Sequence, residues 1–167
     1  NLELDLSQDY ETIFHNYQTN TKRNLKKTLD FNFSIRLIKD VNNFMTMFKK
    51  HVGYKANLKS YHYSIISDLI LTCLNKHMGY LYGLYNQKKE LLAMSFFINY
   101  LNRDVLLFNV SSKLIEANAM TVLIDDYIQK ECSKNKVLDF EGSNIKGVKS
   151  FYKGFGASER NYIYIQK

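Results

Sequence analysis

The sequence contains no proline, only seven glycines and only two cysteines among its 167 residues. Because proline is absent and glycine is scarce, no stretch has the composition of a long linker or a low-complexity tail. No apolar run approaches the roughly 20 residues of a membrane-spanning helix, and the first residues lack the pattern of a secretory signal. A chain of this length can bury one real core. We therefore expect one domain over residues 1–167, with no membrane span.

The cysteines and histidines show no spacing typical of a disulfide framework or a metal site. Cys73 and Cys132 stand alone on predicted helices, so we expect two free thiols in a reducing, cytoplasmic compartment. The four histidines are His15, His51, His62 and His77. Because they show no ligand spacing, we predict no metal site.

The net charge of +7 favours attraction to anions such as nucleic acid, a nucleotide cofactor or an acidic membrane surface, without choosing among them. The predicted helix over residues 21–29 concentrates positive charge, with like charges four positions apart. Each such pair costs about 0.2–0.5 kcal/mol while nothing is bound, and a bound phosphate would turn that cost into a gain. We predict anion or substrate contacts from Lys22, Arg23, Lys26 and Lys27. A solvated basic face is the alternative.

Hydrophobic periodicity predicts alternating strands and helices along the chain. Leu2, Leu4 and Leu6 alternate with acidic residues, as in a half-buried strand, and Ser7 stands where the cap of the next helix belongs. Further strands are predicted over residues 33–37, 79–85, 91–101, 105–111, 137–140 and 161–165. Helices are predicted over residues 21–29, 61–76 and 117–130, after a cap at Asp40, and from residue 145. The connection from strand 105–111 to strand 137–140 should be a right-handed parallel crossover.

Residues 137–157, which read VLDFEGSNIKGVKSFYKGFGA, form the most informative stretch. A short apolar strand ends at Phe140, and the sequence EGS breaks it. Apolar side chains then recur at helical spacing, at Ile145, Val148, Phe151 and Phe155. Gly154 and Gly156 can supply the left-handed turn that ends such a helix. The stretch therefore predicts a strand, a tight loop and a short helix that carries Tyr152.

This stretch resembles the last helix of the GNAT (N-acetyltransferase) superfamily, which carries an aromatic pair, two spacer-like residues, then a hydrophobic residue and glycine. The matching run is Phe151-Tyr152-Lys153-Gly154-Phe155-Gly156. The longer run from DFEGS to FGA is closer to the Fem-type, or FemAB-like, branch. The predicted element order matches the GNAT order over essentially the whole chain. The resemblance implies an α/β (α+β) fold with a mixed, mostly antiparallel sheet flanked by helices and one splayed pair of strands.

The resemblance also implies an N-acyltransferase that moves an acyl group, such as acetyl, from a coenzyme A thioester to the amine of a small molecule or peptide. Tyr152 falls at the tyrosine that protonates the departing thiolate in GNAT enzymes. The alternative is a tyrosine at the edge of the core with its hydroxyl on water. Glu141 is then the best candidate for the base that takes a proton from the amine. Its alternative role is to accept hydrogen bonds from the loop amides.

In the GNAT fold the backbone of two parting strands binds the pantetheine arm, and the following helix aims its N-terminus at the pyrophosphate. The corresponding positions here are Phe108, Asn109, Val110, Ser111, Ser112, Ala117, Asn118 and Ala119. Asn144 resembles a cofactor-contacting asparagine one residue off its usual spacing, and capping of the helix explains it as well. Lys153 could meet a phosphate or simply be exposed. Asp139 is a further candidate substrate contact.

The pyrophosphate loop departs from the GNAT pattern, because Ile115, Asn118 and Met120 replace a glutamine or arginine and two small residues. Fem-type proteins also lack those glycines, and they take the acyl group from aminoacyl-tRNA. One alternative is therefore a Fem-type transferase acting on a peptidoglycan precursor. Such enzymes use two GNAT-like halves, so we would expect a preceding half in a longer protein. A third alternative is a non-catalytic binding domain whose gap is filled by side chains such as Met120.

Overall fold

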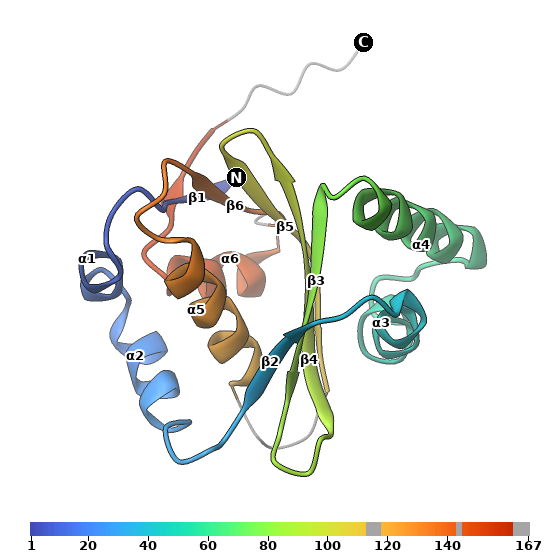
Figure 1. Cartoon of the computed structure of the whole chain (residues 1–167), viewed down its shortest axis with the longest axis horizontal. Helices are drawn as coiled ribbons and strands as arrows, with labels where there is room; N and C mark the ends of the chain where they lie inside the picture. The colour runs from blue at the N-terminus through green and yellow to red at the C-terminus, as the bar shows by residue number, and fades with distance from the viewer. Residues whose placement is uncertain (113–117, 143–144, 162–167) are drawn as a thin grey trace.

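The helices and strands follow one another in the predicted order in this computed structural model, which describes residues 1–112, 118–142 and 145–161. The strands are β1 (Leu2–Asp5), β2 (Ser34–Leu37), β3 (Gly79–Tyr85), β4 (Leu91–Tyr100), β5 (Arg103–Ser111), β6 (Val137–Phe140) and β7 (Ser158–Glu159). The helices are α1 (Tyr10–His15), α2 (Thr19–Lys26), α3 (Val41–Phe48), the π-helix η1 (Lys49–Gly53), α4 (Ser60–Asn75), α5 (Ala119–Glu131) and α6 (Lys146–Lys153). Figure 1 shows these helices around one central sheet.

The seven strands form one sheet in the order β2-β3-β4-β5-β6-β1-β7. Every neighbouring pair is antiparallel except β5 and β6, which are parallel and joined through α5. This arrangement confirms the predicted mixed, mostly antiparallel sheet and its parallel crossover. The N-terminal strand β1 lies between β6 and β7, with Leu2 opposite Phe140. Local periodicity predicted β1 as a strand but not this position in the sheet.

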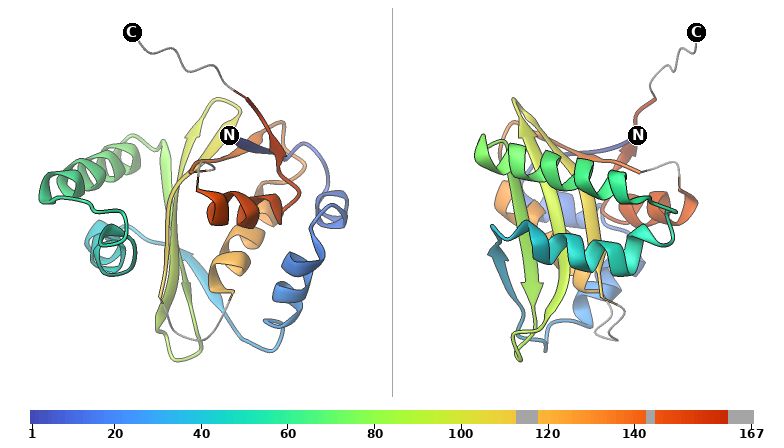
Figure 2. Two further views of the ribbon diagram at one scale, coloured as in Figure 1. Left: turned by 180° about the vertical axis from the view of Figure 1, so that it is seen from behind. Right: turned by 90° about the vertical axis from the view of Figure 1, so that its right-hand side faces the viewer.

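Helices cover the two faces of the sheet in separate groups. Helices α1, α2, α5 and α6 lie on one face, and α3, η1 and α4 lie on the other, as both views in Figure 2 show. The first group packs over a core that includes Leu4, Phe97 and Phe140. The second packs over a smaller core that includes Phe44 and Phe96. Adjacent residues of β4 thus point into different cores, as strand geometry requires.

Strand β4 lies inside the sheet between β3 and β5, and its residues 92–97 are all buried. A strand covered on both faces reads as a continuous apolar run rather than an alternating one, which accounts for the sequence LAMSFF. The second group, formed by α3, η1 and α4, lies over β3, β4 and β5 and does not extend over β6, β1 and β7 (Figure 1). Polar side chains of those three strands therefore occupy an uncovered face, described below.

The local capping predictions were partly wrong. Asp9, not Ser7, caps α1, because its carboxylate accepts a hydrogen bond from the Thr12 N–H at 2.8 Å. The Ser7 N–H instead donates to Asp5. Asp40 caps α3 as predicted.

Other element boundaries also differ from the predictions. The helix predicted over residues 21–29 runs from Thr19 to Lys26. Ala117 and most of the strand predicted over residues 161–165 lie outside the described residues.

Gly154 and Gly156, the two glycines predicted to supply a left-handed turn after the helix, have different roles. Gly156 has a φ of +78°, the left-handed conformation expected after a helix. Gly154 has a φ of −58°, which any residue adopts. Its missing side chain instead admits α2, because an added Cβ would lie 2.3 Å from the Thr21 Oγ1. The Gln18 N–H donates to the Gly154 carbonyl at 2.9 Å, so the two segments are joined at this point.

We predict that Gly154→Ala lowers the free energy of unfolding by about 1–3 kcal/mol, because the new methyl group overpacks the contact with α2. Gly147→Ala is the matched control in the same helix, since an added Cβ there has no atom within 4 Å. Alanine is the better helix former, so this control should be neutral or stabilising. Urea unfolding followed by circular dichroism measures both. Equal effects of the two substitutions would contradict the packing role.

Candidate functional site: a gap between two parallel strands

Strands β5 and β6 separate part of the way along β5. Their parallel pairing runs from Arg103 opposite Val137 to Leu106 opposite Phe140, where β6 ends. Residues 107–111 of β5 continue with β4 on one side and, within the described residues, no strand on the other. Gly142 has a φ of +84° and turns the chain out of the sheet just after β6. The predicted splayed pair of strands is confirmed.

A β-bulge in β5 orients the side chains that border this gap. Phe97 lies opposite Leu106 and Phe96 opposite Phe108, so Leu107 is an extra residue. One inserted residue moves all later side chains to the other face of a strand. Phe108 therefore packs with the core under α3, and Asn109 faces α6.

Tyr152 is held at the gap by its ring and by its hydroxyl. The ring stacks on Phe140, with centroids 4.6 Å apart, and the residue is 3% exposed. The hydroxyl oxygen accepts a hydrogen bond from Asn109 Nδ2 at 2.6 Å. Burial raises the pKa of Tyr152 to about 12, the charge of Glu141 adds to the rise, and the Asn109 amide opposes it. Tyr152 is thus a neutral phenol at physiological pH.

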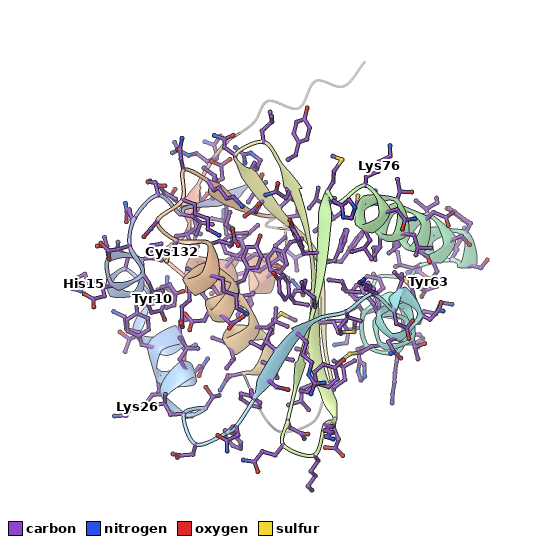
Figure 3. All side chains as sticks on the ribbon, viewed as in Figure 1. Tyr10, His15, Lys26, Tyr63, Lys76 and Cys132 are labelled. Atoms are coloured by element: carbon purple, nitrogen blue, oxygen red, sulfur yellow. The ribbon has the colours of Figure 1, made fainter. Side chains whose placement is uncertain are left out.

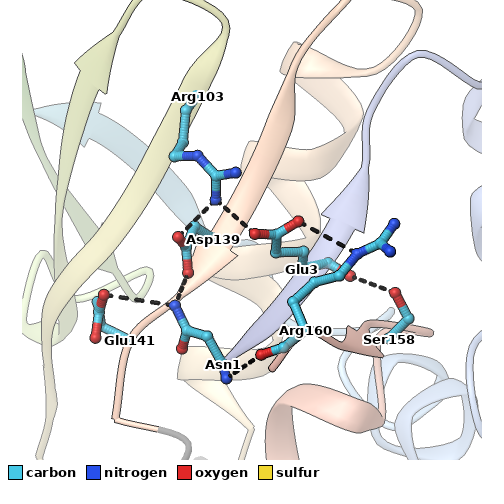
Figure 4. A network of polar contacts seen from close by, with 7 residues as sticks. All are labelled: Asn1, Glu3, Arg103, Asp139, Glu141, Ser158 and Arg160. Atoms are coloured by element: carbon cyan, nitrogen blue, oxygen red, sulfur yellow. Dashed lines mark hydrogen bonds and ion pairs between the residues drawn. The ribbon is translucent and has the colours of Figure 1, made fainter. Parts of the chain in front are cut away.

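The uncovered face of β5, β6 and β1 carries a polar network, drawn in Figure 4. Arg103 Nη1 lies 2.7 Å from Asp139 Oδ2 and 2.8 Å from Glu3 Oε1. The side-chain amide of Asn1 donates to Asp139 and, at 3.5 Å, to Glu141 Oε1. Burial raises the pKa of Asp139, and the Arg103 guanidinium opposes this rise. Asp139 therefore cross-links strands, whereas Glu141 is exposed and makes one long contact in this network.

The first turn of α5 lies against α2. Asn118, the N-cap of α5, has a φ of +92°, and its side chain donates to the Asn24 carbonyl at 3.4 Å rather than capping the helix. Ala119 is buried beside it. The N–H groups of this turn thus have no side-chain cap among the described residues.

The predicted basic run does not gather around that turn. Lys22 Nζ donates to the His15 carbonyl at 2.7 Å, and Arg23 donates to Asn20. Lys26 points outward, away from α5 (Figure 3). Lys27 follows α2 as its C-terminal cap and is exposed.

Four predicted cofactor contacts border one pocket of about 630 Å³ at the gap. They are Asn109, Val110, Ser111 and Ser112, joined by His51, Val52, Lys55 and Ala56 from η1 and the turn after it, and by Ile145 and Val148 from the α6 side. The Met120 sulfur lies 3.3 Å from Ser95 Oγ on β4 and does not line this pocket.

The other predicted contacts lie apart from the pocket. The Phe108 ring packs on Phe48 and Phe96. Lys153 forms an ion pair with Glu159. Ala117 and Asn144 lie outside the described residues.

Sequence reasoning missed the side-chain role of Asn109 and the two basic residues of the pocket, His51 and Lys55. A bulge within an apolar run leaves no local signal for Asn109. The basic residues did leave a signal in the sequence, because residues 41–67 contain four lysines and no acidic residue. In the described part of the chain there is no cluster of three potential metal ligands, and no helix there is long and apolar enough to cross a bilayer.

Comparisons with known proteins establish the fold. No protein-family model and no curated protein sequence matches the chain. The crystal structure of FemX matches with a TM-score of 0.73 and 9% identity, over 94% of this chain and 58% of FemX. A possible acetyltransferase from Clostridium difficile 630 matches with a TM-score of 0.62 and 14% identity, over 81% of this chain and 96% of that one.

An aminoglycoside 6'-N-acetyltransferase from Acinetobacter baumannii matches with a TM-score of 0.53 and 11% identity, over 81% of this chain and 98% of that enzyme. The chain therefore has the GNAT fold, as its sequence predicted. The similar structures include a Fem-type protein. At these identities the likeness concerns the fold. The chain spans less than two thirds of FemX.

The raised pKa of Tyr152 predicts a pH dependence of stability. A tyrosine titrates near 10 when unfolded and Tyr152 near 12 when folded, so the folded chain holds this proton more tightly. The stabilisation is complete below about pH 10 and is lost as pH rises towards 12. In urea unfolding, the wild type should lose stability across this window more steeply than Tyr152→Phe, by at most about 1.4 kcal/mol per pH unit. If the free energies of unfolding of the wild type and Tyr152→Phe changed in parallel with pH across this window, the raised pKa of Tyr152 would be contradicted.

Proposed function

We propose that this chain transfers an acyl group from an acyl-coenzyme A thioester to an amine. The observation that carries the proposal is the Tyr152 hydroxyl, hydrogen-bonded to Asn109 where β5 leaves β6. A neutral phenol lies beside strand backbone that, on the gap side, has no partner strand among the described residues. Thioester aminolysis requires this combination: a proton for the leaving sulfur and amides for the carbonyl oxygen.

The described residues fit such a donor at two places. Backbone groups of residues 107–111 that face the gap are free to hydrogen-bond an extended arm, beside Asn109, Val110, Ser111 and Ser112. The uncapped first turn of α5, at Asn118 and Ala119, suits an anion such as a pyrophosphate. Acetyl-coenzyme A, or another acyl-coenzyme A, would supply the acyl group as an activated thioester. The proposal needs no metal.

Two side chains carry the proton transfers in this proposal. Glu141 accepts the proton that the amine loses as the C–N bond forms, since it is exposed and its charge reaches Tyr152. Tyr152 holds a proton on Oη that it can give to sulfur as the C–S bond breaks. Return of a proton from Glu141 to Tyr152 through solvent restores both groups. Asp139, held by Arg103, positions β6 and with it Glu141.

A second candidate is a Fem-type transfer from aminoacyl-tRNA to a peptidoglycan precursor, completed by a preceding GNAT-like half. The match to FemX over 94% of this chain and the outward Lys26 favour it. The discriminating measurement is RNA binding against salt. A steep salt dependence that flattens in Lys26→Ala/Lys27→Ala, without binding of acetyl-coenzyme A, would favour this candidate over the first.

We predict that Tyr152→Phe lowers kcat for acetyl transfer to a primary amine by about 100-fold or more, because general acid catalysis contributes on that scale. Acetyl-coenzyme A binding, measured by calorimetry, should change little. The ring still stacks on Phe140, so the loss of stability should stay near 1 kcal/mol. Tyr100→Phe, at a tyrosine that is 61% exposed, is the matched control. Failure of the wild type to bind acetyl-coenzyme A would overturn the proposal.

A further inference from the structure

The segment that borders the pocket on the side of η1 has a one-sided charge. Residues 41–67 contain Lys49, Lys50, Lys55 and Lys59 and no aspartate or glutamate. The segment therefore contributes four positive charges of a net +7. Clustered positive charge beside a cleft raises the local concentration of anionic ligands.

These lysines differ in what they already contact. Lys49 Nζ lies 5.1 Å from the centroid of the Tyr63 ring and is thereby directed towards α4. Lys50 and Lys55 are exposed, and neither has an ion-pair partner within the described residues. By contrast, Lys149 on α6 is already paired with Glu159. Lys55 is therefore able to bind a charged ligand without breaking an existing pair.

Among the described residues that line the pocket, Lys55 is also the only side chain with a full charge at neutral pH. None of the other described lining residues is acidic, and several of them, such as Val52 and Ile145, are apolar. Apolar walls weaken the screening of a charge by water and so strengthen its attraction for an anion. Asn109 also lines the pocket, and its hydrogen bond joins the pocket to the Tyr152 hydroxyl.

The backbone supports this placement of Lys55. The chain leaves α3 through the π-helix η1, a widened turn that often marks functional sites. Gly53 closes η1 against α4, since an added Cβ would lie 2.2 Å from the Tyr63 hydroxyl. The turn that follows, with Lys55 and Ala56, borders the same pocket as Ile145 and Val148 at the start of α6.

We propose that the acceptor is a primary amine that also bears an anionic group, a phosphate or a carboxylate, bound by Lys55 at the mouth of this pocket. The amine lies at the Asn109 end, and the anionic group lies at the η1 end. This inference rests on the proposed function, because it names the class of acceptor for the same site. It adds a specificity residue, Lys55, that contacts no reacting atom.

The test compares three small amines that share a two-carbon spacer: O-phosphoethanolamine, β-alanine and ethanolamine. Their binding to the full chain is followed by amide chemical shifts in NMR, which needs no turnover. We expect the phosphate or the carboxylate compound to bind at least about tenfold more tightly than ethanolamine, with shifts at Val52, Lys55 and Ser111. A tenfold ratio corresponds to about 1.4 kcal/mol, within reach of one partly desolvated ion pair.

Two charge reversals make the test specific. Lys55→Glu should abolish the preference for the anionic amine. Lys76→Glu, the control with the same change in net charge, should retain it, because Lys76 follows the other end of α4. That helix has 16 residues and is about 24 Å long at 1.5 Å per residue.

Three results would overturn the inference: equal binding of all three amines, equal effects of the two reversals, or shifts confined to α2. Acetyl transfer to ethanolamine as fast as to both anionic amines would also overturn it while the proposed function stood. Selective binding without any acetyl transfer would instead refute the proposed function and leave an anion-selective pocket.

Discussion

The unequal lengths of β5 and β6 determine where this sheet can accept a ligand. β6 pairs along all four of its residues, while β5 continues past it to Ser111. A buried peptide group without a partner costs about 1–3 kcal/mol, so an unpaired edge persists only where water or a ligand reaches it. Here the pocket formed by η1, β5 and α6 reaches it. Within the described residues, the end of the β5–β6 ladder at Leu106 thus leaves both the opening and the hydrogen-bonding groups beside it.

The rest of the structure orients side chains towards that opening. The bulge at Leu107 turns Asn109 towards α6, and the stack on Phe140 holds Tyr152 against Asn109. Helix α6 is fixed in turn by α2, which approaches so closely that a Cβ at residue 154 would overlap the Thr21 side chain. On the uncovered face, Arg103 joins β5 to its neighbours through ion pairs and holds the two strands together where they do pair. Ion pairs therefore support the part of β5 and β6 that is paired, whereas ring stacking and a hydrogen bond orient the side chains where the two strands separate.

The sequence predicted whatever depends on local periodicity or on a contiguous motif. β1 was recognisable from Leu2 and Leu4, and Tyr152 from the aromatic pair in its helix. What could not be predicted depends on distant partners. The position of β1 is set by pairing with a strand more than 130 residues away, at Phe140. The bulge lies in an apolar run whose residue types fit either register.

Capping and glycine roles show the same limit on a smaller scale. Ser7 and Asp9 are both good capping residues two positions apart, and only the structure reveals that the Ser7 N–H is already bonded to Asp5. Gly154 and Gly156 both fit a left-handed turn. Contact of Gly154 with Thr21, a residue far away in the chain, separates their roles. The charge of residues 41–67 was visible in the sequence, but its position beside the gap was not.

The most direct measurement of the central claim is amide hydrogen exchange along β5 by NMR. If the strands part after Leu106, some amides of residues 107–111 should exchange about 100-fold or more faster than those of residues 104–106. These fast amides should slow when acetyl-coenzyme A is added. Uniform protection along the whole of β5, unchanged by acetyl-coenzyme A, would show a closed ladder and contradict the account.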